Sequence, residues 1–169
     1  MSKENSKFKK GYSLIEVLLA IGVFSLLAVL VTQTLANTLR SAKKSDTQSK
    51  VRTNFDYAIS VMERQLRNAD NITTCDGNPS NIIEYTDANG DSADFYCNLA
   101  NEYVASRSGT RDDHLTSDEV SLTSCSFTCT QESGVPDSIE ISLSGTDNTG
   151  SGVESSHVTV QTRVMLRTY

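Results

Sequence analysis

The strongest pattern in the chain is a single early run of apolar residues. Across residues 14–31 the only interruptions are Glu16, Gly22 and Ser25. A helix needs roughly 20 predominantly apolar residues to cross a bilayer. We therefore predict a hydrophobic transmembrane or assembly helix over residues 12–36.

The helical pattern continues past the apolar run. Residues 32–50 contain no glycine or proline, and apolar residues then recur at steps of three and four, as on one face of a helix. We predict that this face is core packed on a sheet, that residues 37–74 form an amphipathic continuation, and that the helix ends near Asp70. The stripe consists of Val51, Phe55, Ala58, Met62, Leu66 and Ala69.

After Pro79 the pattern changes to short strands separated by turn residues. The last strand alternates apolar and polar residues, which is typical of a sheet with one buried face. We predict an α+β fold, in which residues 75–169 form a β-rich head of about half a dozen strands and its antiparallel sheet packs on the helix. The expected strands are 82–86, 93–97, 102–106, 119–130, 138–144 and 156–168, with a turn at 134–136; the expected sheet core is Phe127, Ile139, Ile141 and Leu143.

Charge divides the chain in the same way as hydrophobicity. The 169 residues carry a formal net charge of -6, but residues 1–11 hold four lysines against one glutamate, a net of +3, which leaves -9 on the rest. A basic segment before an apolar stretch stays on the cytoplasmic side of a membrane. This distribution of charged and apolar residues excludes an ordinary cytosolic globular protein, a multi-span membrane protein and a basic nucleic-acid-binding protein. We therefore do not expect DNA binding.

Glu16 distinguishes the apolar run from a simple anchor. An ionised carboxylate within a membrane helix costs about 2.5–3.5 kcal/mol, so such a residue usually has a partner. If the chain is cut after Gly11, the free α-amino group of Tyr12 lies four residues away, and the same group of a neighbouring copy is a second candidate. A cleaved secretory signal fits less well, because its apolar stretch is only about 7–15 residues long.

Residues 9–16 read Lys-Lys-Gly-Tyr-Ser-Leu-Ile-Glu and lead into the apolar helix. This segment resembles the processing site of type IV prepilins and type II secretion pseudopilins: a basic pair, glycine, an aromatic, a small hydroxyl residue, two aliphatics and glutamate. The resemblance implies that a prepilin peptidase removes residues 1–11, cleaving between Gly11 and Tyr12, and methylates the new amine. It also implies that Glu16 pairs with a Tyr12-type amine during filament assembly, and that the α+β fold is pilin-like.

The implied role is structural, not enzymatic. We expect a single-pass membrane protein with a cytoplasmic leader that later joins an extracytoplasmic, cell-surface filament such as a type IV pilus. The long head and the absence of any proline before Pro79 favour a minor pilin. The implied partners are prepilin peptidase, other pilin or pseudopilin subunits, an inner-membrane assembly platform and, before assembly, membrane lipid.

Two alternatives to a pilus subunit remain open. One is a pseudopilin of a type II secretion or competence machine. The other, from a different class, is a membrane-anchored extracytoplasmic binding or adhesion domain that does not polymerise.

Four cysteines are candidates for disulfides, and four cysteines allow three complete pairings. Cys125 and Cys129 fall on one predicted strand, where four residues span about 13 Å. A disulfide needs Cα atoms within about 7 Å. Either the strand bends between these two cysteines, or they pair with Cys75 and Cys97.

Asp87, Asn89 and Asp91 alternate in the manner of a calcium loop. The full loop pattern and its distal glutamate are missing, and the Asn-Gly pair at 89–90 indicates a hairpin turn. The two histidines lack a nucleophile motif. We therefore expect no metal, no cofactor and no catalytic residue, with calcium as the alternative at this turn.

Overall fold

The computed structural model describes residues 11–148 and 157–166. The chain divides into two compact units, Met1–Ala42 and Lys43–Tyr169. A single helix, α1 (Leu14–Arg67), contributes to both units. It ends at Arg67, three residues before the predicted end.

The first unit contains the apolar part of α1, and none of this part is buried. All residues from 14 to 42 are exposed, with Phe24 at 74%. The hydroxyl groups of Thr32, Thr34 and Thr38 each donate a hydrogen bond to the carbonyl oxygen four residues earlier, at 2.8–2.9 Å. The helix thus satisfies these hydroxyls internally, as a segment in lipid must.

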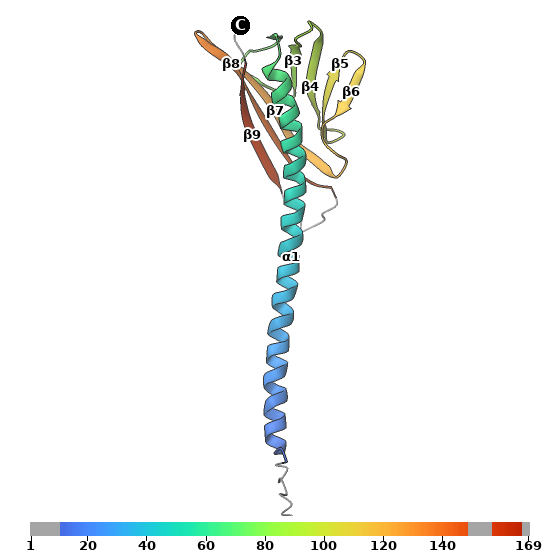
Figure 1. The fold of residues 1–169 in the computed structure, drawn as a ribbon, viewed down its shortest axis with the longest axis vertical. Helices are drawn as coiled ribbons and strands as arrows, with labels where there is room; N and C mark the ends of the chain where they lie inside the picture. The colour runs from blue at the N-terminus through green and yellow to red at the C-terminus, as the bar shows by residue number, and fades with distance from the viewer. Residues whose placement is uncertain (1–10, 149–156, 167–169) are drawn as a thin grey trace, which may run out of the picture. The chain divides into compact units, whose positions relative to one another are not determined.

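The second unit contains the rest of α1 and two antiparallel sheets, and Figure 1 shows the helix in front of both. In the five-stranded sheet the order is β1-β3-β4-β5-β6, and in the four-stranded sheet it is β2-β7-β8-β9. The first comprises β1 (Asn71–Ile72), β3 (Ile82–Thr86), β4 (Ser92–Asn98), β5 (Tyr103–Ser108) and β6 (Arg111–His114). The second comprises β2 (Pro79–Ser80), β7 (Val120–Glu132), β8 (Val135–Asp147) and β9 (Val158–Met165).

These elements confirm the predicted α+β architecture, one long N-terminal helix packed on antiparallel strands. The sequence pattern indicated one antiparallel sheet, and the described strands form two, of five and four strands. Strands β1 and β2 have only two residues each, and all four residues of β6 are exposed, so none of the three shows an alternating pattern.

The predicted turn at 134–136 is also wrong in its extent. The turn consists of Ser133 and Gly134, and β8 already begins at Val135. Pro136 is tolerated in this strand because it lies beside a register shift of the β7–β8 ladder and before the first pair with β9, at Ser138.

The predicted helical stripe forms the centre of the core. Its members from Val51 to Leu66 are fully buried, and Ile59, which was not predicted, lies beside them at 7% exposure. The predicted sheet core is also confirmed, since Ile139, Ile141 and Leu143 are fully buried and Phe127 is 1% exposed.

Two hydrogen bonds tie the polar flanks of this stripe to the two sheets. On one flank, the Thr162 hydroxyl of β9 donates to Glu63 Oε1 at 2.7 Å. On the other, the Tyr85 hydroxyl of β3 donates to Gln65 Oε1 at 2.7 Å. Because the two bonds lie on opposite sides of the stripe, they fix the rotation of the helix about its own axis.

The four cysteines pair as Cys75–Cys129 and Cys97–Cys125, with Cα–Cα distances of 4.8 and 6.2 Å. Strand β7 pairs continuously with β8 from Ser124 to Thr130, so it does not bend between its two cysteines. The structure therefore has the second of the two alternatives left open by the sequence. The Cys97–Cys125 bond joins β4 of one sheet to β7 of the other.

Gly145 on β8 is packed tightly between strand β7 and the helix. A Cβ atom there would lie 2.5 Å from the Ser121 carbonyl oxygen and 2.7 Å from Phe55 Cζ. We expect Gly145→Ala to lower the free energy of unfolding by about 1–3 kcal/mol, through overpacking, measured by urea denaturation in detergent micelles. The matched control is Gly22→Ala, which has no neighbour within 4 Å. Equal stability of the Gly145→Ala and wild-type proteins would contradict this packing.

The disulfides provide a second test. Removal of the Cys97–Cys125 bond by the double Cys→Ser variant should cost about 3–4 kcal/mol for a 28-residue separation, read as a lower urea midpoint. Chymotryptic cleavage after Tyr85, Tyr103 and Phe127, without reduction, separates all four cysteines onto different peptides. Mass spectrometry should then recover the two pairs above, and a Cys75–Cys97 peptide pair would show that the assignment is wrong.

Candidate processing and assembly site

The start of α1 is defined by Ser13. Its carbonyl oxygen accepts hydrogen bonds from the backbone amides of Glu16 at 3.0 Å and Val17 at 3.3 Å. The residues before it, Gly11 and Tyr12, are not helical, and Tyr12 is 83% exposed. The peptide bond between Gly11 and Tyr12 therefore lies outside the helix, in an accessible stretch of backbone.

Glu16 lies in the first turn of α1 and is exposed. A carboxylate in this position interacts favourably with the unpaired backbone amides at a helix N-terminus. Ser13 and Glu16 also have the spacing of a capping box, in which serine begins the helix and glutamate follows three residues later. The Ser-x-x-Glu spacing at residues 13–16 is the sequence signal for this cap, and the hydrophobic pattern alone does not reveal it.

The structure does not bring Glu16 and Tyr12 into contact: within the described residues, no hydrogen bond or ion pair joins their side chains. The chain here still carries its first residues, so the nitrogen of Tyr12 is an amide and not an amine. The predicted leader falls mostly on residues 1–10, which lie outside the described residues. The predicted pairing therefore stays a prediction.

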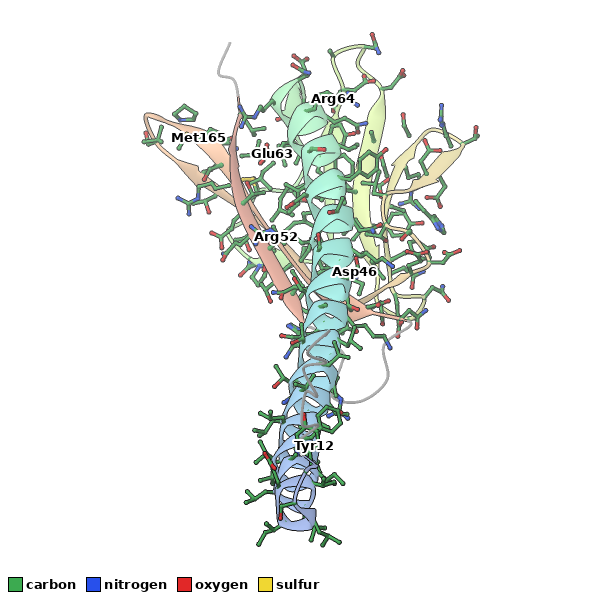
Figure 2. The ribbon with its side chains drawn as sticks, turned by 60° about the horizontal axis from the view of Figure 1, so that its bottom comes forward. Tyr12, Asp46, Arg52, Glu63, Arg64 and Met165 are labelled. Carbon is green, nitrogen blue, oxygen red and sulfur yellow. A yellow bond between two sulfur atoms is a disulfide. The ribbon has the colours of Figure 1, made fainter. Side chains whose placement is uncertain are left out.

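The apolar side chains after Glu16 project on all sides of the helix, as Figure 2 shows. Among the described residues, α1 is the one helix long and apolar enough to cross a membrane. An apolar surface on every face differs from the one-sided stripe of a helix that packs on its own domain. This part of α1 can be covered by lipid or by other protein chains.

The other predicted site residues lie in the second unit. The cysteines form a structural framework in its core. Asp87 closes the β3–β4 turn: its Oδ1 accepts from the backbone amides of Asn89 and Asp91, both at 2.9 Å. These hydrogen bonds lower the pKa of Asp87. The part of the chain that the structure describes holds no cluster of three or more metal-binding side chains.

Comparison with known proteins gives one match. Residues 6–32 match the family described as the prokaryotic N-terminal methylation motif. No curated protein and no solved structure matches the chain.

The matched segment contains Gly11, Tyr12, Ser13 and Glu16 together with the apolar run. The motif implies processing by a prepilin peptidase and assembly with other pilins, and it points to a structural subunit. The chain carries the leader signature of type IV prepilins and pseudopilins, and its long helix packed on antiparallel sheets is a pilin-like architecture.

Proposed function

We propose that the chain is a minor pilin, a structural subunit of a type IV pilus or related filament. It is matured by cleavage between Gly11 and Tyr12 and joins the filament through its N-terminal helix. The observation that carries the proposal is an apolar helix, exposed on every face, that begins in register with the methylation motif.

The apolar surface of this helix is costly to leave in water. Exposed apolar area costs about 25 cal/mol per Å² in water. Every residue from 14 to 31 is exposed, and the large apolar side chains among them keep 46–79% of their accessible area. Lipid covers them while the protein sits as a single-pass membrane precursor. Helices of neighbouring subunits cover them after assembly, when the head lies outside the cell membrane.

Glu16 gives this helix a means of specifying its neighbour. In a bundle of apolar helices, a lone carboxylate is expensive, and the amine of Tyr12 created by cleavage supplies the opposite charge. Two such groups compensate each other only when they are brought within hydrogen-bonding distance. The Glu16–Tyr12 pair therefore fixes how far one subunit is shifted along the filament axis relative to its neighbour.

The division of the chain follows from these roles. Residues 1–11 are the leader that is removed, and residues 12–36 are the membrane and assembly helix. Residues 37–74 are its amphipathic continuation, helical as far as Arg67 and followed by β1, and residues 75–169 are the head. α1 contains no proline from Leu14 to Arg67, which supports a minor subunit. A pseudopilin of a type II secretion or competence machine, which shares the motif, is the second candidate.

Maturation can be read from the intact mass of the protein recovered from cells. We expect a chain that begins with N-methylated Tyr12, because the Gly11–Tyr12 bond lies before the helix. Gly11→Val should leave the precursor uncleaved, since a branched side chain replaces the small residue at the cut. A wild-type chain that still begins at Met1, or one cut near Ala36, would refute the proposed maturation.

Assembly can be tested with one substitution. We expect Glu16→Val to insert into the membrane normally but to be absent from sheared filaments, because the Tyr12 amine loses its partner. The matched control is Ser25→Val, which removes a polar group from the same run without a charge and should assemble normally. If Glu16→Val enters filaments at the wild-type level, the charge pair is not what specifies assembly.

A further inference from the structure

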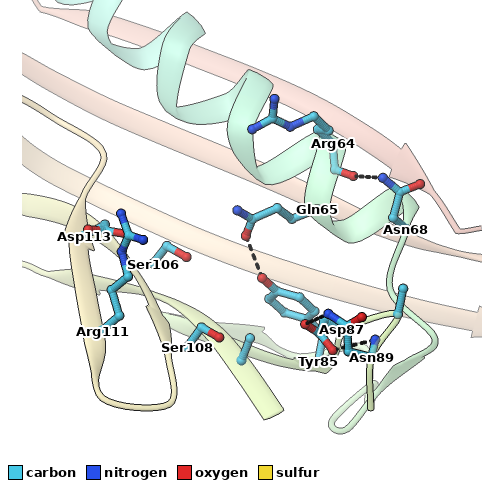
Figure 3. Close-up of a pocket in the computed structure, with 12 residues that line it drawn as sticks. Arg64, Gln65, Asn68, Tyr85, Asp87, Asn89, Ser106, Ser108, Arg111 and Asp113 are labelled. Carbon is cyan, nitrogen blue, oxygen red and sulfur yellow. Dashed lines mark hydrogen bonds and ion pairs between the residues drawn. The ribbon is translucent and has the colours of Figure 1, made fainter. Parts of the chain in front are cut away.

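A polar cleft of about 470 Å³ lies within the second unit, between the last turns of α1 and the inner face of the five-stranded sheet. Figure 3 shows Arg64 and Gln65 of the helix on one side and the β5–β6 hairpin, with Arg111, on the other. This volume falls in the range of about 300–1,000 Å³ that is usual for small-molecule sites.

The cleft exists because the side chains on the inner face of the sheet change from large and apolar to small and polar along β5. Val104 on this face is fully buried in the core. The next two residues on the same face are Ser106 and Ser108, and Ser108 pairs with Ala93 of β4. These small side chains leave a hollow where larger apolar ones would have extended the core.

Tyr85, at the floor of the cleft, stays protonated. Tyr85 is 3% exposed, and its hydroxyl donates to Gln65 at 2.7 Å. Burial, together with the charges of Asp87 and Asp94, raises the pKa of Tyr85 to about 12. The ring therefore stays neutral and keeps Gln65 oriented at any physiological pH.

Among the described charged residues that line the cleft, Arg64 is the cation without an ion-pair partner. Arg111 is paired with Asp113 at 2.6 Å. The carboxylate of Asp87 accepts hydrogen bonds from backbone amides of the β3–β4 turn. Arg64 has Ser60 and Asn68 four residues away on either side, and it forms no ion pair in the described part of the chain. By contrast, Arg67 on the same last turn pairs with Glu63 at 3.8 Å.

We propose that this cleft binds an oligosaccharide that carries a sugar carboxylate, with Arg64 as the partner of that carboxylate. A guanidinium group pairs with a carboxylate through two parallel hydrogen bonds. The serine hydroxyls and the amides of Gln65 and Asn68 supply the donors and acceptors that ring hydroxyls need.

Other ligands fit the cleft less well. A protein partner usually buries aromatic or aliphatic anchors at the centre of its interface, and the one aromatic ring here is covered. A polyphosphate would meet the carboxylates of Asp87 and Asp113, which balance the two arginines that line the cleft. A ligand with many hydroxyls and few charges suits this composition best.

The test uses the full-length protein in detergent micelles, so that binding is measured independently of filament assembly. The probes are a short neutral oligosaccharide that ends in one galacturonic acid and the same oligomer with that carboxyl group methyl-esterified. Calorimetry should detect binding of the acid form and at least about tenfold weaker binding of the ester, because a charge-assisted pair is lost.

Three variants locate the site. Arg64→Gln should weaken binding of the acid oligomer at least about tenfold and leave binding of the ester unchanged. Ser108→Leu should weaken both by filling the hollow. Arg67→Gln, on the same turn but outside the cleft, should bind like wild type. The proposal is overturned if neither probe binds, or if Arg64→Gln and Arg67→Gln have equal effects on the acid oligomer.

Discussion

The burial of one helical face against two sheets is the interaction on which the rest of the head depends. The stripe from Val51 to Leu66 supplies the centre of the core, and each sheet is attached to it by apolar packing and by one hydrogen bond to a flank of the helix. At Gly145 the contact is so close that no side chain fits. The Cys97–Cys125 bond joins the two sheets directly, and the polar cleft lies between the last turns of the helix and the five-stranded sheet.

The two parts of α1 illustrate two solutions to the same physical problem. From Lys43 onward, the helix buries one stripe against its own chain, and a polar surface suffices elsewhere. From residue 14 to residue 31 it is apolar on every face and exposed, so that lipid or other protein chains can cover it. A single uninterrupted helix therefore combines a packed core segment with an exposed apolar segment, and the change in hydrophobic pattern marks where one ends and the other begins.

Much of this organisation could be predicted from the sequence, because long periodic patterns report burial directly. The helix, its stripe and strands such as β3 and β9 were recognisable from the spacing of apolar residues. Strand β6, with four exposed residues, and the two-residue β1 and β2 left no such signal. Cysteine pairing and the cleft also escaped prediction, since both depend on which strands become neighbours in space. In the sequence, Arg64 is indistinguishable from other exposed basic residues of the helix. Only the fold brings it to the same cleft as Ser106 and Ser108 of β5.

The disulfide pattern limits how far the head can lengthen under tension. The Cys75–Cys129 bond closes a loop that contains both partners of the second bond, and its cysteines are 54 residues apart. At about 3.4 Å per extended residue, that loop withholds roughly 180 Å of chain from any pull applied through the two ends. A subunit pulled through its helix could release only the segments outside the loop, so the two covalent bonds act as a mechanical stop even after the packing around them has failed.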